Sequence, residues 1–141
     1  MADPVDVEGW LALVSQHEQA ARKLSEDKKS ARMGYFHAVM AVECALKAYI
    51  WYIERFNQPP DIKTRPDLFS HNLRLLKDKA GIKVKSTDAQ APSWLVILQA
   101  DRSQYYDPAP MPRKTARAMA DAAFGEKGVV TWIRTALTRR S

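Results

Sequence analysis

A single cysteine, Cys44, is present in the chain, so no internal disulfide can form. Because Cys44 lies inside an apolar segment, we interpret it as a buried and inert thiol. No apolar run approaches the ~20 residues of a membrane span. The acidic first residues, MADPVDVEGW, lack the basic region that opens a secretory signal. These absences predict a cytoplasmic protein with no membrane partner.

Signatures of cofactor and metal sites are also missing. The five glycines form no GxGxxG or GxxxxGKS/T loop for phosphates, and no GxSxG nucleophile elbow occurs. One cysteine and three widely spaced histidines cannot supply a standard zinc site. We therefore expect neither a metal nor a cofactor. No alternating pattern is long enough to build a β-sheet.

What is present is an ordinary globular composition with unevenly placed charge. Hydrophobic residues make up 46% of the 141 residues and charged residues 27%, which fits one domain over 1–141. Residues 1–62 carry 7 Lys and Arg against 9 Asp and Glu, a net charge of −2. Residues 63–141 carry 15 against 7, a net charge of +8. A basic half can attract polyanions, although scattered basic residues also occur on solvated helix faces.

Five segments have the periodicity of helices and are separated by turn and loop signals. The segments cover residues 7–26, 32–56, 67–82, 92–105 and a stretch onward from 115. Asp6 and Thr115 are suited to cap the first and the last of them. Gly81 is suited to end the third, and Gly125 and Gly128 predict a kink or break in the last. The sequence therefore predicts an all-α fold.

The segment 32–56 is apolar nearly all round, so we expect it to be the central helix. Its large side chains form one stripe along the helix and its small side chains form another. Small residues let a neighbouring helix approach closely, so the two stripes predict packing against at least two helices. The large stripe is Tyr35, Val39, Val42, Leu46, Ile50 and Ile53, and the small stripe is Ala38, Ala41, Ala45 and Ala48.

Several motifs follow one another in a defined order. Residues 41–48 read Ala-Val-Glu-Cys-Ala-Leu-Lys-Ala, and residues 71–76 read His-Asn-Leu-Arg-Leu-Leu after a Pro-Pro loop. An aromatic-flanked Arg102 then precedes a Pro-rich turn, and a closing helix contains Trp132-Ile133. This ordered set, over about residues 8–138, resembles the HEPN superfamily. In that family a helix with an A-x-E-x-x-L-K-A pattern leads to a loop and a His-(Asp/Asn)-Leu-x-x-Leu element.

The resemblance implies an antiparallel bundle of four main helices plus a short one, often dimeric. It also implies one of three activities. Some members of the family are metal-independent endoribonucleases, including toxins. Others bind nucleotides, and others are partner subunits of nucleotidyltransferases.

The ribonuclease members use an Arg followed, after four to six residues, by a His near the start of a late helix. The Arg stabilises phosphate charge and the His moves a proton. The matching region begins at Arg102, but no histidine follows His71, so the catalytic pair is absent there. Arg32 and His37 have the required spacing on the wrong helix. Five residues also turn ~140° around a helix, so these two would not share a face.

The resemblance leaves a small set of candidate ligand-binding residues, in which Lys or Arg would meet a phosphate and Tyr would stack on a base. Each residue also has a structural interpretation. Lys47 can form an i,i+4 ion pair with Glu43, His71 can bond a helix N-terminus, and the others can anchor a helix end. The candidates are Lys47, His71, Arg102, Tyr105 and Tyr106.

We therefore expect a noncatalytic HEPN-like protein that binds a nucleotide or nucleic acid, as a dimer or partner subunit. One alternative is a HEPN-type endoribonuclease or toxin that uses the displaced pair, and another is a pure protein-interaction subunit. Trp51, Tyr52 and Trp132 are expected at the surface of a small bundle, which predicts a homodimer. The expected partners are a nucleotide or RNA and, as a protein, a nucleotidyltransferase or the antitoxin of a toxin–antitoxin pair.

Overall fold

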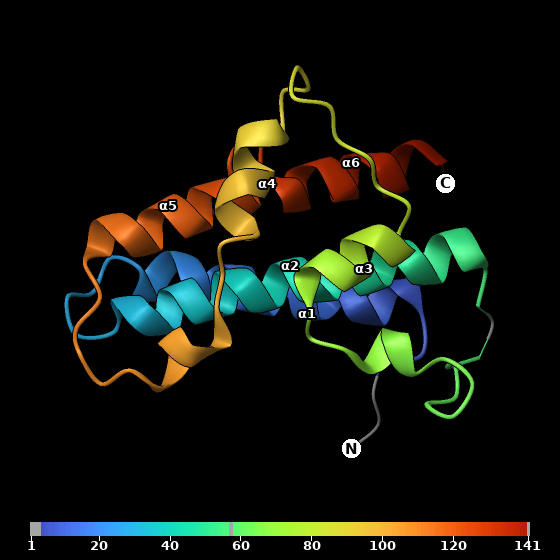
Figure 1. Ribbon diagram of the computed structural model, residues 1–141, viewed down its shortest axis with the longest axis horizontal. Helices are drawn as coiled ribbons and strands as arrows, with labels where there is room; N and C mark the ends of the chain where they lie inside the picture. Colours follow the sequence, from blue (N-terminus) through green and yellow to red (C-terminus); the bar gives the residue numbers. More distant parts are fainter. Residues whose placement is uncertain (1–3, 57, 141) are drawn as a thin grey trace.

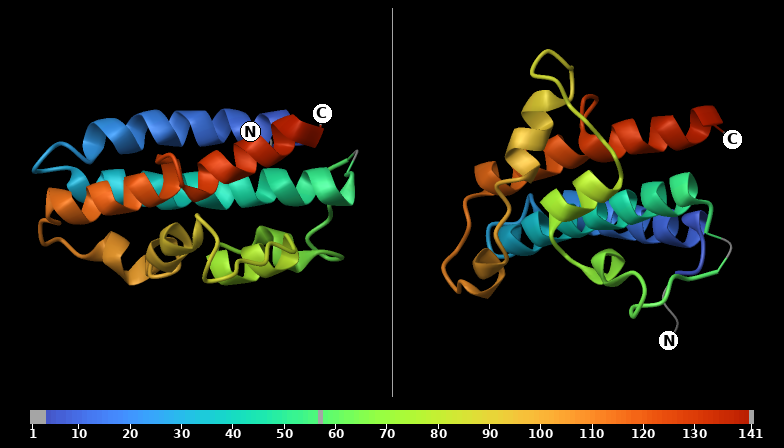
Figure 2. Two further views of the ribbon diagram at one scale, coloured as in Figure 1. Left: turned by 90° about the horizontal axis from the view of Figure 1, so that it is seen from above. Right: turned by 45° about the vertical axis from the view of Figure 1, so that its right-hand side comes forward.

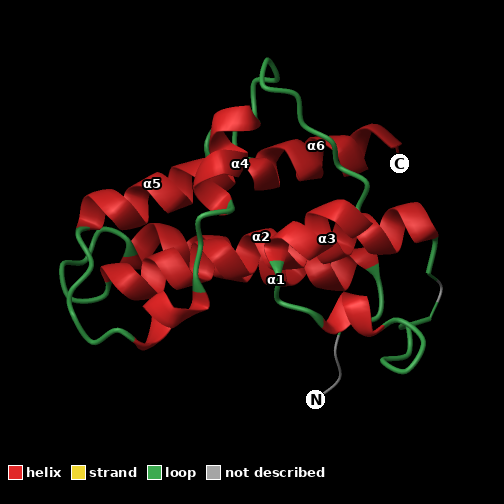
Figure 3. Cartoon of the chain, viewed as in Figure 1, coloured by secondary structure: helices red, strands yellow, loops and turns green. Residues whose placement is uncertain are grey.

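The computed structural model describes residues 4–56 and 58–140, and the side chains of Arg102 and Arg140 lie outside this description. The described residues form helices and loops, with no strand among them (Figure 3). The all-α prediction is therefore confirmed. None of the described helices combines the length and the hydrophobicity that crossing a bilayer requires. In chain order the elements are α1 (Val7–Leu24), α2 (Ala31–Glu54), η1 (Pro66–Phe69), α3 (Leu73–Lys79), α4 (Ala91–Ile97), η2 (Arg102–Tyr106), α5 (Arg113–Phe124) and α6 (Val129–Arg140).

The α1 and α2 helices form an antiparallel pair along the long axis of the molecule (Figure 1). The predicted cap of α1 is confirmed, because Asp6 Oδ1 accepts a hydrogen bond of 2.8 Å from the Gly9 N–H. The connection between the two helices turns back so tightly that Gly34 of α2 lies against Ser25. This close approach seats the start of α2 on the end of α1.

The α2 helix is central, as predicted. Residues 41–51 are all buried, and α1, α3, α5, α6 and η2 contact this helix. The left view of Figure 2 shows α1 along one side of α2, with α3, α4 and η2 along the other side. The alanines of the small stripe are fully buried. Packing against several neighbours explains why the sequence of α2 is apolar nearly all round.

The aromatic residues expected at the surface are less exposed than predicted. Trp51 is only 4% exposed, so its expected surface position is wrong. Its ring meets the ring of Trp10 edge-on, with 5.4 Å between the centroids, because the first turns of α1 cover it. Tyr52 and Trp132 are partly buried and pack against the core. The homodimer remains a prediction.

Two segments predicted as continuous helices are interrupted. Residues 67–82 contain η1, then extended backbone at Ser70, then α3, which Asn72 caps by accepting hydrogen bonds from two backbone N–H groups. Residues 92–105 contain α4, a turn, and then η2, which begins anew because the Asp101 side chain accepts from the Ser103 N–H. In both places a side chain caps the new turn that follows the break. Gly81 follows α3 at a φ of +71°, as its predicted role requires.

The closing helix is broken where the two glycines predicted a break. The α5 helix ends before Gly125, and α6 begins after Gly128. A Cβ atom at Gly128 would lie 2.5 Å from the Ala123 carbonyl oxygen, so the turn needs glycine there. The predicted cap at Thr115 is wrong: α5 begins at Arg113, directly after Pro112, whose φ of −58° already suits a helix start.

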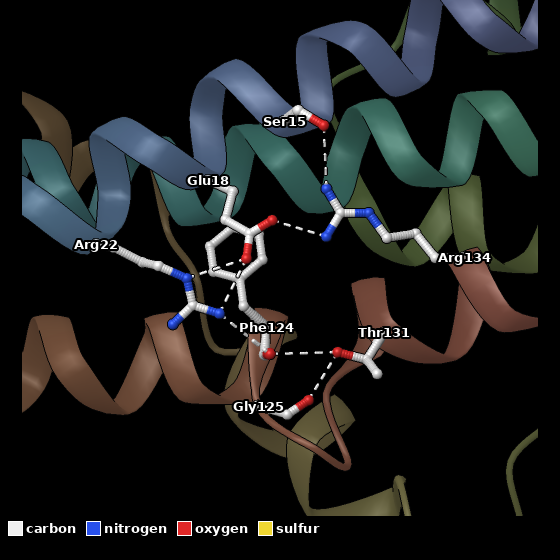
Figure 4. A network of polar contacts seen from close by, with 7 residues as sticks. All are labelled: Ser15, Glu18, Arg22, Phe124, Gly125, Thr131 and Arg134. Atoms are coloured by element: carbon white, nitrogen blue, oxygen red, sulfur yellow. Dashed lines mark hydrogen bonds and ion pairs between the residues drawn. The ribbon is translucent and has the colours of Figure 1, made fainter.

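A polar network fastens α1 to the α5–α6 turn (Figure 4). Glu18 of α1 accepts hydrogen bonds from Arg134 of α6 at 2.7 Å and from Arg22 at 3.0 Å. Arg22 also donates to the Phe124 carbonyl at 3.4 Å, and the Thr131 hydroxyl donates to the Gly125 carbonyl at 2.7 Å. Burial raises the pKa of Glu18, but its hydrogen bonds with the two arginines outweigh burial and lower the pKa. The carboxylate therefore stays charged and holds the turn against α1.

The close approach at Gly34 predicts whether Gly34→Ala stabilises or destabilises the protein. Helix propensity alone would make Gly34→Ala stabilising by about 1 kcal/mol. A Cβ atom at this position would lie 2.5 Å from the Ser25 backbone nitrogen, which cannot move without shifting the turn. We therefore expect a net loss of at least about 1 kcal/mol in the free energy of unfolding, measured by urea denaturation. The exposed neighbour Met33→Ala should be near neutral, and a stabilised Gly34→Ala variant would contradict the close packing.

Candidate functional site

A cleft of about 550 Å³ lies where α2, α3, η2 and the end of α4 meet. One wall consists of residues 70–74, from the loop before α3 and its first turn. The other wall consists of the end of α4 and the following turn, with Asp101 and Tyr105. Val39 contributes from α2. The volume is within the usual range of small-ligand sites.

The first wall is held by short-range capping bonds. The Ser70 hydroxyl accepts from the Asn72 N–H at 2.9 Å, and Asn72 Oδ1 accepts from the N–H groups of Arg74 and Leu75. These bonds place His71 just before α3 and Arg74 in its first turn, so both line the cleft. Arg74 Nη2 also lies 3.4 Å from the Leu98 carbonyl oxygen of the second wall. The guanidinium therefore stands beside both walls.

His71 is held in place by a buried carboxylate. Its Nδ1 lies 2.9 Å and 3.1 Å from the two carboxylate oxygens of Glu43, which is only 4% exposed. An ionised carboxylate can only accept, so Nδ1 carries the proton of this hydrogen bond. The second ring nitrogen, Nε2, is left for a ligand or water. Half of the His71 side chain is exposed to solvent.

Lys47 completes this arrangement from inside the core. It is 5% exposed, and its Nζ lies 3.1 Å from Glu43 Oε2, so the ion pair that the spacing suggested is present. The ammonium also lies 5.4 Å from the centre of the Trp10 ring, a cation–π distance. Lys47 and His71 thus meet at one carboxylate. The described lining of the cleft includes His71 but not Lys47.

The second wall contains one of the two candidate tyrosines. Tyr105 lines the cleft, and its ring stands edge-on to Phe36 of α2, with centroids 4.6 Å apart. Tyr106 is 80% exposed and is not among the described residues that line the cleft. Arg102 begins η2, but its side chain lies outside the described part of the chain.

Arg32 and His37 contact different elements. The two terminal nitrogens of Arg32 each donate a 2.7 Å hydrogen bond, one to the Gln104 carbonyl and one to the Ala109 carbonyl. These bonds hold η2 and the loop after it on α2. His37 instead pairs with His17 of α1. The described contacts therefore account for Arg32 as an anchor of η2 and for His37 as part of the α1–α2 interface.

The pairing of His17 with His37 constrains their protonation. The two Nδ1 atoms are 2.9 Å apart, so one must carry a proton while the other accepts. Burial lowers the pKa of both histidines. The charge of His37 lowers the pKa of His17 further, and Glu43 opposes this effect in part. The pair is therefore neutral at physiological pH.

Asp101 is the acidic group of the cleft. Its Oδ1 accepts from the Ser103 N–H at 3.0 Å, which begins η2. The backbone and side-chain hydrogen bonds of Ser103 lower the pKa of Asp101, so the carboxylate is charged at neutral pH. Oδ2 keeps capacity for further bonds.

Three of these side chains were not predicted as site residues. Glu43 was interpreted only as the partner of Lys47, Arg74 was a variable position inside the His-Asn-Leu-x-x-Leu element, and Asp101 had no motif. The spacing alone did not indicate that 71–74 and 97–105 would face one cleft, although the family resemblance placed His71 and Arg102 in one candidate site. In residues 4–56 and 58–140, no three His, Cys, Asp or Glu side chains form a group able to hold a metal ion.

The buried pair makes the first site prediction. Glu43→Gln keeps the shape of the side chain but leaves Lys47 buried without an anion. We expect the free energy of unfolding, measured in urea, to fall by about 3–5 kcal/mol. Adding Lys47→Met should recover most of this loss, and the exposed Glu126→Gln should cost little. A loss below about 1 kcal/mol in Glu43→Gln would contradict a buried charge pair.

The histidine pair makes a prediction about pH. Lowered folded-state pKa values mean that the unfolded chain binds more protons as pH falls through 6.5, so stability decreases from pH 7 to pH 5. The slope can reach about 1.4 kcal/mol per pH unit for each extra proton. His17→Gln can still form a hydrogen bond but does not titrate, so it should flatten the slope. Urea denaturation at three pH values measures this.

The window between pH 5 and pH 7 isolates the histidines. The carboxyl groups with lowered pKa values, Glu18, Glu26, Asp67 and Asp101, start from ordinary values of 4.5 or below and titrate at more acidic pH. A wild-type stability that stays constant across the window would contradict the protonation argument. An unchanged slope in His17→Gln would contradict its assignment to this pair.

Comparison of the chain with models of known protein families, with curated proteins and with solved structures gave no match. This result neither supports nor opposes the resemblance to the HEPN superfamily. The chemistry of the cleft therefore has to be derived from the side chains that line it and from those that hold them.

Proposed function

We propose that the protein binds a nucleotide, or the phosphate-bearing end of a nucleic acid, in the cleft between α3 and η2. The observation that carries this proposal is the placement of His71 and Arg74 on one wall, with Tyr105 on the other. The proposed protein is HEPN-like and noncatalytic, and it acts as a homodimer or as the partner subunit of a nucleotidyltransferase or antitoxin.

Phosphate chemistry suits the first wall. A guanidinium offers forked N–H donors that match phosphate oxygens, and hydrogen bonds between charged groups are the stronger ones. The doubly protonated form of His71 adds a donor at Nε2 in a fixed orientation, because Glu43 accepts a hydrogen bond from its Nδ1. The net charge of +8 over residues 63–141 attracts polyanions toward this half of the chain. These features favour a ligand with a phosphate group over a neutral one.

The second wall suits the rest of a nucleotide. Every base has a flat π-face, and a tyrosine ring is a common surface for stacking. Tyr105 is pre-positioned for this role, because its ring packs on Phe36 and because Arg32 ties η2 to α2. A fixed ring loses little conformational freedom when a ligand binds, which favours affinity.

One observation favours a catalytic alternative. A histidine oriented by a carboxylate, next to an arginine in a cleft, meets the basic requirement for proton transfer beside a phosphate. This alternative is an endoribonuclease centred on His71 and not on Arg32 and His37, whose described contacts are structural. Incubation with mixed-sequence RNA in the absence of metal tests it. Cleavage that disappears in His71→Ala would favour the endoribonuclease over the noncatalytic binding protein.

Removing Arg74 tests the binding proposal directly. Loss of a charge-assisted hydrogen bond to phosphate should weaken binding by roughly 10- to 150-fold. Calorimetric titration of wild-type and Arg74→Ala protein with ATP, GTP and a short RNA measures the change. Arg74 is exposed, with one 3.4 Å bond to the Leu98 carbonyl, so the variant should fold normally.

The matched control is Arg139→Ala, an exposed arginine of α6 outside the described lining of this cleft. It removes the same charge and should leave binding within about twofold. If no probe binds at millimolar concentration, the nucleotide proposal fails and the protein-interaction subunit becomes the better interpretation. Equal affinities of wild-type and Arg74→Ala would also refute the proposed site.

A further inference from the structure

We propose that the cleft selects ribonucleotides, and that Asp101 makes the selection by accepting hydrogen bonds from the ribose hydroxyl groups. This inference rests on the proposed function and adds a substrate class and a specificity residue to it. It follows from the different charges of the two walls. One carries a guanidinium and the other a carboxylate, and a site for phosphate alone would not need the carboxylate.

A carboxylate in a phosphate site needs an explanation, because it repels the ligand. Asp101 is exposed and lines the same cleft as His71 and Arg74. Like charges in one site are unfavourable, so a bound phosphate will lie at the wall of residues 70–74, away from Asp101. The ligand portion that reaches Asp101 must therefore present hydrogen-bond donors.

Ribose hydroxyls meet this requirement. An ionised carboxylate can only accept, and a pair of vicinal hydroxyls offers two O–H donors. Carboxylates bind ribose hydroxyls in this way in dinucleotide sites. The 2′-hydroxyl is also the group by which a protein distinguishes RNA from DNA. A deoxyribose leaves a carboxylate oxygen without a donor, so it binds more weakly.

The carboxylate is also held ready for a ligand. Asp101 and Gln104 form a capping box at the start of η2, in which each side chain accepts a hydrogen bond from the backbone N–H of the other residue. The Gln104 side chain accepts from the Tyr35 hydroxyl at 2.9 Å, and the Gln104 carbonyl accepts from Arg32. Two residues of α2 thus fix the turn that carries Asp101. Bonds to a pre-positioned acceptor cost little ordering entropy.

The walls together define one orientation for the ligand. The phosphate lies against His71 and Arg74, the ribose hydroxyls face Asp101, and the base lies beside Tyr105. A nucleotide has these three parts in a fixed covalent order. Inorganic phosphate satisfies only the first of them, and a nucleoside without phosphate satisfies only the other two.

The test compares sugars on one base. Wild-type protein is titrated calorimetrically with adenosine 5′-monophosphate, its 2′-deoxy form and its 2′,3′-dideoxy form. We expect the ribonucleotide to bind roughly 10- to 150-fold more tightly than the dideoxy form, because hydrogen bonds to a charged acceptor are lost. In Asp101→Ser the ratio should fall to near 1. Serine is chosen because it also caps helical turns.

Asp61→Ser is the matched control. Asp61 accepts from the N–H two residues later, at 2.9 Å, just as Asp101 does, but it is not among the described residues that line the cleft. This variant should keep the wild-type ratio. If circular dichroism shows that Asp101→Ser does not fold, Asp101→Asn replaces it, because asparagine caps well while it removes the charge and turns one acceptor oxygen into an amide donor.

The outcomes separate this inference from the proposed function. If neither these three nucleotides nor ATP, GTP and RNA bind, the proposed function itself is wrong. If ATP or GTP binds but none of the three monophosphates does, the orientation proposed here is overturned. If all three bind wild-type protein equally, the nucleotide site stands and ribose selection is overturned. If the ribonucleotide is preferred to the same extent in Asp101→Ser, another group reads the sugar and the assignment to Asp101 is overturned.

Discussion

Glu43 places a carboxylate inside the most apolar helix of the chain, where an unpaired charge would cost several kcal/mol. Lys47, one turn along α2, neutralises it from within the core, and His71 approaches it from the surface. The carboxylate accepts hydrogen bonds from both, so the docking of the loop before α3 on α2 helps to compensate the buried charge. This docking connects the core of the bundle to the first wall of the cleft. The position of His71 therefore follows from the buried charge as well as from the capping bonds of its own loop.

The opposite wall depends on the same helix. Arg32, Tyr35 and Phe36 lie in the first turns of α2. They hold η2 through one carbonyl, an amide side chain and an aromatic ring, and Arg32 also holds the following loop through the Ala109 carbonyl. Both walls are thus positioned by the same helix, α2, at points about two to three turns apart along it. A site supported in this way keeps its geometry better than one built from two independent loops. It also explains why Arg32 is so fully engaged, since η2 contains few apolar side chains that could anchor it.

Periodicity and caps were sufficient to predict the helices, because burial of α2 and the capping of α1 are encoded by adjacent residues. The breaks after Phe69 and Ile97 were not predictable in the same way. At each break one side chain, Asn72 or Asp101, caps the turn that follows, and a single cap is a weak signal in a sequence. The candidate site was predicted only in part for a related reason. His71 and Tyr105 were identified through a family resemblance, whereas Arg74 and Asp101 became neighbours only through the packing of two interrupted segments.

The burial of Lys47 changes what the charged residues of the site can do. A lysine was expected to meet phosphate, yet its ammonium and the Glu43 carboxylate cancel one another below the cleft. The donors that an anion would meet in the cleft are the Arg74 guanidinium and, when the ring is doubly protonated, Nε2 of His71, while Asp101 supplies a negative edge. The excess of +8 in the second part of the chain can raise the local concentration of anions, but it acts at long range and is screened by salt. In the proposed function, discrimination among anions would therefore come from the placement of these three side chains.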